Sequence, residues 1–104
     1  MAQLKTRRLG RTGWQVTTLG LGGQASIQWT ADGVDPIAII EKAYRLGINY
    51  IDTSNVYGPS QANFGEAFRK LGLSPAAGNY DAQARGKIYI ASKTHIRTGR
   101  RPGG

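Results

Sequence analysis

The sequence predicts an α/β fold in which a β-hairpin precedes a sheet of parallel strands. Segments with helical apolar spacing alternate with short apolar strand segments over residues 19–92, and this alternation is typical of right-handed β–α–β crossovers. Glycines and prolines separate the segments at the expected boundaries. Two of the strand segments end in charged residues, Asp52 and Lys93. In parallel α/β folds, the carboxyl ends of the strands usually carry the functional side chains.

The amino-terminal segments predict the hairpin. Residues 4–9 and 14–18 are extended segments on either side of Gly10-Arg11-Thr12-Gly13. Two such segments around a glycine-bounded turn indicate a β-hairpin over residues 4–18. Trp14 is expected to contribute to the packing of this hairpin.

A glycine-rich strand is predicted next, over residues 19–23. Its glycines leave room for the close approach of a backbone or a ligand. Residues 24–34 are expected to form a loop, on which Trp29 is a candidate for lining a substrate pocket.

A helix is predicted to begin at Asp35 and Pro36, because Asp is a favoured N-cap and Pro a favoured first helical residue. Apolar residues at spacings of three and four predict one buried stripe, formed by Ile37, Ile40, Ala43 and Tyr44. Gly47 is expected to end the helix. A buried strand then follows over residues 48–51 and ends at Asp52.

A second helix is predicted over residues 61–71, with Ser60 as its N-cap and Gly72 ending it. Its apolar face comprises Phe64, Ala67, Phe68 and Leu71. Residues 73–86 are predicted to form a long loop, and residues 87–92 the next strand.

These elements amount to about three of the eight strands of a (β/α)8 TIM barrel, which typically needs about 250 residues. We therefore predict that residues 1–104 are the N-terminal part of such a barrel, with a flexible tail over residues 94–104. Two helices can cover only one face of the sheet, so the other face and both edges are expected to favour aggregation.

Composition excludes several classes of site. The chain has no cysteine, which excludes disulfides and thiolate metal sites, and its one histidine, His95, cannot form a zinc site alone. No apolar run approaches the roughly 18 residues of a membrane span, and no secretion signal follows Arg7-Arg8. A cytoplasmic protein is therefore expected.

The net charge of +8 permits nucleic-acid binding, led by Arg97, Arg100 and Arg101. However, the basic residues are scattered and no aromatic side chains are interleaved with those of the tail. Nucleic-acid binding is therefore the weakest of the alternatives.

The residues at the strand ends predict a proton-donor site. Tyr57 lies on the loop after Asp52, and Lys93 ends the following strand. A phenol ordinarily has a pKa of about 10 and is a weak acid at neutral pH. A nearby ammonium stabilises the phenolate form and so improves proton donation near neutrality. A carboxylate beside the ammonium keeps it charged and oriented.

At these residues the chain resembles the N-terminal part of an aldo-keto reductase, over nearly the whole sequence. The spacing of Asp52 and Tyr57 within Gly-Ile-Asn-Tyr-Ile-Asp-Thr-Ser is the most specific part of the resemblance. The other matching segments are Arg7-Arg8-Leu9-Gly10-Arg11-Thr12-Gly13, Leu19-Gly20-Leu21-Gly22-Gly23, Tyr44-Arg45-Leu46-Gly47, Phe64-Gly65-Glu66-Ala67 and Ile90-Ala91-Ser92-Lys93.

This resemblance implies a (β/α)8 barrel that reduces a small aldehyde or ketone to an alcohol with NADPH. It makes Tyr57 the proton donor, Lys93 the residue that tunes it, and Asp52 the partner of Lys93 and a contact to the nicotinamide ribose. Further contacts to the cofactor are implied for Gly22, Gly23 and Gln24.

The chain departs from the family pattern in three ways. The family's fourth catalytic residue is a histidine at the end of the fourth strand, beyond this chain, and His95 is not its equivalent. The loops that bind the adenosine phosphates are also absent, and Ser60-Gln61 replaces the usual Ser-Glu. We therefore expect a truncated form that is inactive alone. A non-catalytic, NADPH-binding subunit of another assembly is the alternative.

Overall fold

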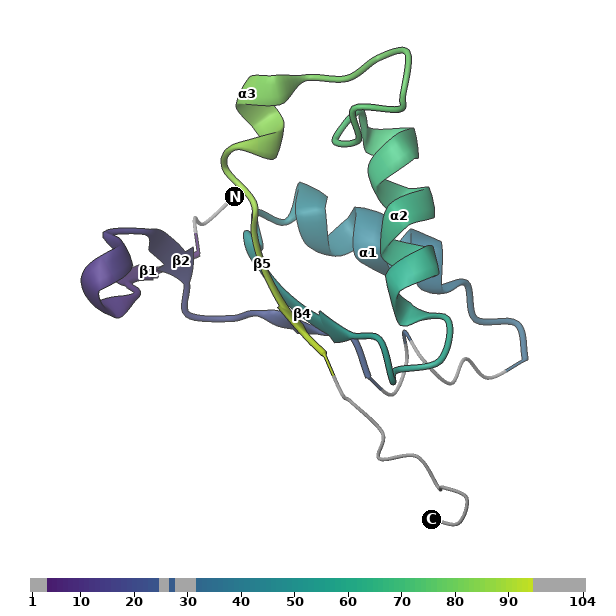
Figure 1. Ribbon diagram of the computed structural model, residues 1–104, viewed down its shortest axis with the longest axis horizontal. Coiled ribbons are helices and arrows are strands. Elements are labelled where there is room, and N and C mark those ends of the chain that lie inside the picture. Colours follow the sequence, from purple (N-terminus) through teal and green to yellow (C-terminus); the bar gives the residue numbers. More distant parts are fainter. Residues whose placement is uncertain (1–3, 25–26, 28–31, 95–104) are drawn as a thin grey trace, which may run out of the picture.

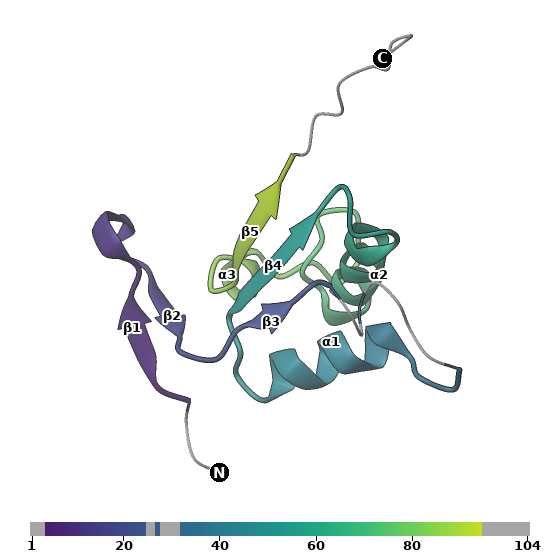
Figure 2. The same ribbon diagram turned by 90° about the horizontal axis from the view of Figure 1, so that it is seen from below.

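The computed structural model describes residues 4–24, 27 and 32–94, which form a parallel sheet with helices on one face (Figure 1). The sheet has the strand order β3-β4-β5. Its strands are β3 (Leu21–Gly22), β4 (Tyr50–Ser54) and β5 (Tyr89–Lys93). Strand β3 is shorter than the predicted strand over residues 19–23. All three strands run in the same direction, as Figure 2 shows.

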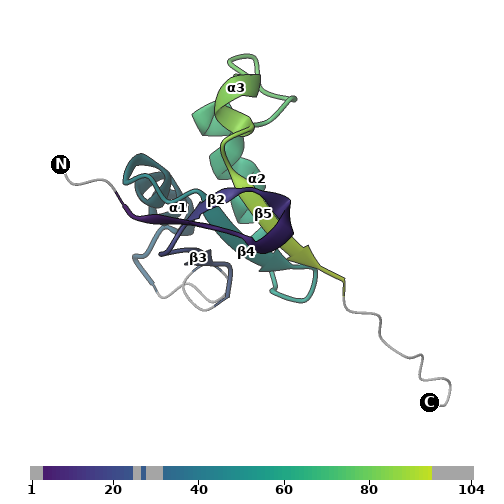
Figure 3. The same ribbon diagram turned by 90° about the vertical axis from the view of Figure 1, so that its left-hand side faces the viewer.

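The first two strands form a separate antiparallel hairpin. They are β1 (Thr6–Arg8) and β2 (Gln15–Thr17), joined through a 3-10 turn, η1 (Gly10–Thr12). Gly13 follows the turn with a φ of 74°, a backbone conformation that favours glycine. The hairpin lies at the amino ends of the parallel strands (Figures 2 and 3).

Asn49 and Trp14 attach this hairpin to the sheet. The Thr17 amide donates a hydrogen bond of 2.7 Å to Asn49 Oδ1, and Asn49 Nδ2 donates one of 3.0 Å to the Gln15 carbonyl. The Trp14 ring stacks on Tyr89, with the ring centroids 4.9 Å apart. The predicted packing role of Trp14 is therefore confirmed.

Helix α1 (Pro36–Arg45) begins and ends as the sequence predicts. The Ile37 amide donates a hydrogen bond to the Asp35 carboxylate, which caps the helix. Gly47 has a φ of 98° and its amide donates to the Tyr44 carbonyl, while the Ile48 amide donates to the Ala43 carbonyl. These two bonds form a Schellman motif. Because this motif uses the Ile48 amide, β4 begins at Tyr50 rather than at the predicted Ile48. The strand also continues to Ser54 instead of ending at the predicted Asp52.

Helix α2 (Ser60–Leu71) corrects one prediction. Ser60 is not the N-cap: Pro59 occupies that position, and no side chain caps the helix. The Ser60 hydroxyl instead points inward and forms a hydrogen bond of 2.8 Å with the Thr53 hydroxyl. Gly72 ends the helix in the left-handed conformation, as predicted.

The predicted long loop over residues 73–86 is wrong in its last part, which contains the short helix α3 (Ala82–Arg85). The Asp81 carboxylate accepts hydrogen bonds from the Gln83 and Ala84 amides and so caps this helix. The amides of residues 87 and 88 donate to carbonyls of α3. This explains why β5 begins at Tyr89 and not at the predicted residue 87.

The core lies between the sheet and helices α1 and α2, which cover the same face (Figure 1). Its buried residues are Ile27, Ile40, Ile51, Phe64 and Ala67. Most of both predicted apolar stripes faces this core, through Ile37 and Ile40 of α1 and through Phe64, Ala67 and Phe68 of α2. Phe64 meets Phe68 edge to face. Because side chains alternate along a strand, residues 50 and 52 point to the opposite face, which no described helix covers.

Candidate active site

The candidate site lies at the carboxyl end of the sheet. In the parallel register, Asp52 of β4 pairs with Gly22 of β3 on one side and with Ala91 of β5 on the other. Two residues further along, Ser54 pairs with Lys93. Residues in register point to the same face. Gly22, Asp52 and Lys93 therefore share the face opposite to the helices.

Asp52 and Lys93 form an ion pair. Lys93 Nζ donates a hydrogen bond of 2.5 Å to Asp52 Oδ1. The two side chains are 48% and 42% exposed, so water screens their attraction and the pair adds little to stability. Its main effect is to fix the position of the ammonium.

The hydrogen bond to the Asp52 carboxylate raises the pKa of the Lys93 ammonium above its ordinary value of 10.5. Partial burial opposes this effect, while the neighbouring Tyr57 and the negative charge of Asp52 add to it. Lys93 is consequently protonated at neutral pH and can stabilise negative charge beside it.

Tyr57 comes to the same cluster from the loop between β4 and α2. Its amide donates a hydrogen bond of 3.2 Å to the Ser54 carbonyl, and its carbonyl accepts one of 2.9 Å from the Ser60 amide. Lys93 Nζ lies 4.9 Å from the centroid of the Tyr57 ring. The structure thus brings together the phenol, the ammonium and the carboxylate.

The three residues expected to contact a cofactor occupy different environments. Gly22 and Gln24 are exposed, and a Cβ on Gly22 would meet nothing within 4 Å. Gly23 is buried, and a Cβ there would overlap the Asp52 carbonyl oxygen and lie 2.6 Å from Ser60 Oγ. Gly22 therefore borders open space beside Asp52, whereas the packing of β3 on β4 and α2 is sufficient to explain Gly23.

Two hydrogen-bonded pairs of polar residues at this end of the sheet are not predicted by the sequence. Thr53 pairs with Ser60, and the Gln61 amide donates a hydrogen bond of 3.1 Å to Ser92 Oγ. The signal for the first pair is a Thr in a buried strand followed, after a loop, by a Ser at a helix start. Such a Ser is indistinguishable in sequence from an N-cap.

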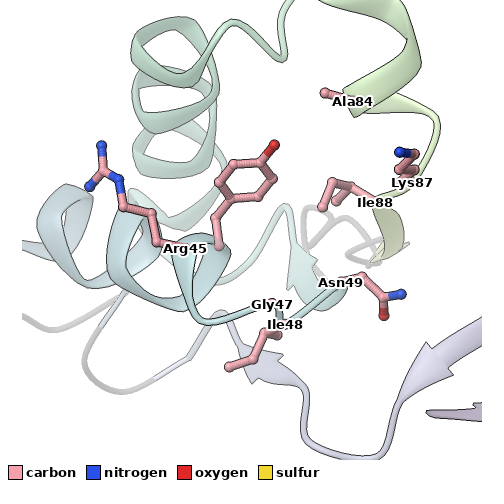
Figure 4. A pocket seen from close by; sticks show the side chains of 8 residues that line it. Arg45, Gly47, Ile48, Asn49, Ala84, Lys87 and Ile88 are labelled. Atoms are coloured by element: carbon pink, nitrogen blue, oxygen red, sulfur yellow. The ribbon is translucent and has the colours of Figure 1, made fainter. Parts of the chain in front are cut away.

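Other candidates lie outside the described residues: Trp29, His95, and the tail arginines Arg97, Arg100 and Arg101. A hollow of about 470 Å³ is lined in part by Gly47, Asn49 and Lys87, which are labelled in Figure 4. It lies at the amino ends of β4 and β5, away from the Asp52–Lys93 pair. No helix in the part of the chain that the structure describes has both the length and the hydropathy of a membrane span.

The aldo/keto reductase family model matches residues 18–103. The chain is 40% identical over 94 residues to aldo-keto reductase AMT2 of Alternaria alternata, covering 84% of this chain and 23% of that protein. It is 38% identical over 60 residues to L-galactose dehydrogenase of Arabidopsis thaliana, covering 56% of this chain and 19% of that protein.

A solved structure of an aldo-keto reductase from Pseudomonas aeruginosa superposes with a TM-score of 0.59 at 31% identity, covering 84% of this chain and 30% of that chain. The chain thus spans between 19% and 30% of the length of these three relatives. The residues matched by the family model include all three strands of the parallel sheet and the side chains of Asp52, Tyr57 and Lys93. The chain belongs to the aldo/keto reductase family.

Proposed function

We propose that this chain is the N-terminal part of a (β/α)8 barrel that reduces an aldehyde or ketone to an alcohol with NADPH. The observation that carries the proposal is the cluster in which Lys93 contacts both Asp52 and Tyr57. The family membership supports the reaction class, and the relatives' greater length supports completion of the barrel by further strands.

In this proposal Tyr57 donates the proton. Its hydroxyl gives a proton to the carbonyl oxygen of the substrate, and the bond electrons remain on the phenolate. The Lys93 ammonium, whose Nζ lies 4.9 Å from the centroid of the Tyr57 ring, stabilises that charge. Asp52 holds the ammonium in place and in its protonated form.

The described residues fit the nicotinamide end of the cofactor. Gly22 leaves open space beside Asp52, and only one oxygen of the Asp52 carboxylate bonds to Lys93, so the other can accept a hydrogen bond from a ribose hydroxyl. When bound, NADPH would supply the hydride that joins the carbonyl carbon. Binding of the adenosine phosphates would require residues outside the described part of the chain.

The test is a steady-state assay of NADPH oxidation with small aldehydes and ketones, on a chain completed with the remaining strands of a family barrel. Tyr57→Phe removes the proton donor and is expected to lower kcat by about 10²–10⁴-fold. Full turnover in this variant would refute the assignment of Tyr57. NADPH binding without turnover in the unsubstituted chain would favour the non-catalytic subunit.

The 104-residue chain is expected to be inactive alone, because it supplies only the acid and its partners. Measurable, aldehyde-dependent oxidation of NADPH by the purified 104-residue chain would contradict this expectation.

A further inference from the structure

We propose that Ser60 and Gln61, the first two residues of α2, are positioning residues that hold Tyr57 against Lys93. They would do so by fastening the start of the helix to the two strands that carry Asp52 and Lys93. The inference rests on the proposed function, because it concerns the same group of side chains.

Ser60 connects α2 to β4. Its side chain is fully buried and its hydroxyl lies 2.8 Å from that of Thr53, which is 4% exposed and directly follows Asp52. A Cβ on Gly23 would lie 2.6 Å from Ser60 Oγ. The end of β3, the end of β4 and the start of α2 therefore meet at this hydroxyl, which leaves Ser60 no space to move.

The backbone transmits this position to Tyr57. The Ser60 amide donates a hydrogen bond to the Tyr57 carbonyl, and the Tyr57 amide donates one to the Ser54 carbonyl. The Ser54 hydroxyl also accepts a hydrogen bond of 3.3 Å from the Val56 amide. Tyr57 is thus held between the end of β4 and the start of α2, and a shift of Ser60 would move it.

Gln61 connects the same helix end to β5. Its side-chain amide donates to Ser92 Oγ, and Ser92 is the register partner of Thr53 and the residue before Lys93. Adjacent residues of α2 therefore bind adjacent strands, one through a buried hydroxyl and the other through an exposed amide. Together they set the separation between the Tyr57 loop and the Lys93 strand end.

The readout is the titration of Lys93, followed by NMR of its side chain in the completed chain, where further strands would cover the edge of β5. This readout needs no turnover. Asp52 from β4 and Tyr57 from the loop are the titratable groups that act on Lys93. Tyr57→Phe removes the contribution of the hydroxyl and is expected to lower the pKa of Lys93. An unchanged Lys93 titration in Tyr57→Phe would overturn the proposal, because Tyr57 would then not be held against Lys93.

The decisive variants are Thr53→Val, which removes the hydroxyl at nearly constant volume, and its matched control Thr53→Ser, which keeps it. Thr53→Val is expected to lower the Lys93 pKa as Tyr57→Phe does, with no further decrease in the double variant. Thr53→Ser is expected to leave it unchanged. A Thr53→Val chain that loses thermal stability but keeps the Lys93 titration would reduce the hydroxyl pair to a structural role.

Gln61→Ala tests the second contact at an exposed position, where folding is not at risk. A smaller downward shift of the Lys93 pKa is expected, against none for Gln83→Ala on α3, which is also exposed. No shift in Gln61→Ala would remove Gln61 from the proposal. These readouts are independent of reductase activity, so an inactive completed barrel would refute the proposed function and leave this inference standing.

Discussion

The fold alters the ionisation of Lys93, and the direction of this change makes the stability of the fold depend on pH. Its pKa is higher in the folded chain than in the unfolded chain, chiefly because of the Asp52 carboxylate. The folded chain therefore binds the proton more tightly. The stability that this adds is complete below pH 10.5 and is lost as the pH rises through the raised value.

A lysine that keeps its proton is a poor nucleophile. We expect Lys93 to be acylated more slowly than the exposed Lys70 at pH 9–10 (about one unit below the ordinary lysine pKa), and Asp52→Asn to accelerate its acylation. Competitive labelling with a trace of acylating reagent, followed by peptide mass spectrometry, measures both rates. Equal rates for Lys93 in the two chains would show that the carboxylate does not hold the proton.

Gly22 and Gly23 form a matched pair for stability. Gly23→Ala places a Cβ against the Asp52 carbonyl and Ser60 Oγ, and the resulting backbone shift is expected to cost about 1–3 kcal/mol. Gly22→Ala meets open space and should change the free energy of unfolding by less than about 0.5 kcal/mol. Chemical denaturation of both variants measures the difference. Equal losses would contradict the close packing at Gly23.

The cluster of Asp52, Tyr57 and Lys93 could be predicted from the sequence, but the contacts that position these residues could not. Asp52, Tyr57 and Lys93 could be predicted because each follows or ends a recognisable strand segment. The Thr53–Ser60 pair could not, because a buried hydroxyl pair has no sequence period and depends on how tightly β3 approaches β4. The close packing of β3 on β4 also explains Gly23. The sequence alone does not reveal this, because a glycine in a strand is compatible with the close approach of either a ligand or another backbone.

At the scale of the elements, hydrogen bonds of Asn49 help to attach the hairpin to the sheet. The Asn49 side chain bonds to the Thr17 amide and the Gln15 carbonyl, and the Asn49 backbone amide donates to Thr17 Oγ1. Asn49→Ala removes the side-chain bonds, at a cost of roughly 2 kcal/mol for bonds of about 1 kcal/mol each.

This loss should be local. In Asn49→Ala, hydrogen exchange at the Thr17 amide is expected to accelerate, while amides of the β4–β5 ladder keep their protection. Amide exchange measured by NMR resolves the two regions. Loss of protection throughout the sheet would mean that the hairpin and the sheet fold as one unit.

Helix ends were predicted well where a side chain or a glycine determines them. Asp35, Gly47 and Gly72 act locally, through a carboxylate cap and two left-handed glycines, so their effect is visible in the sequence. Helix α3 was missed although Asp81 caps it in the same way as Asp35 caps α1. Its four residues are too few to show an apolar period.

For the molecule as a whole, the arrangement leaves β5 at an edge of the described sheet. Ile90 on this strand is 37% exposed, although its register partner Ile51 is buried beneath the helices. An exposed apolar edge strand favours pairing with another chain, and we expect the 104-residue chain to self-associate. Ile90→Lys should shift it towards monomer, while Ile90→Val should not. Sedimentation velocity distinguishes these outcomes, and a chain that is already monomeric would contradict the expectation.

Strand β5 contacts the hairpin through its first residue and the candidate site through its last residue. Tyr89, where Trp14 stacks, and Lys93, which binds Asp52, alternate with Ile90 and Ser92 and so share one face. An odd number of residues inserted between Tyr89 and Lys93 would turn one of them towards the helices, whereas an even number would preserve both orientations. The attachment of the hairpin and the geometry of the Asp52–Lys93 pair thus depend on the same parity, so that this strand can be lengthened without a β-bulge only in steps of two.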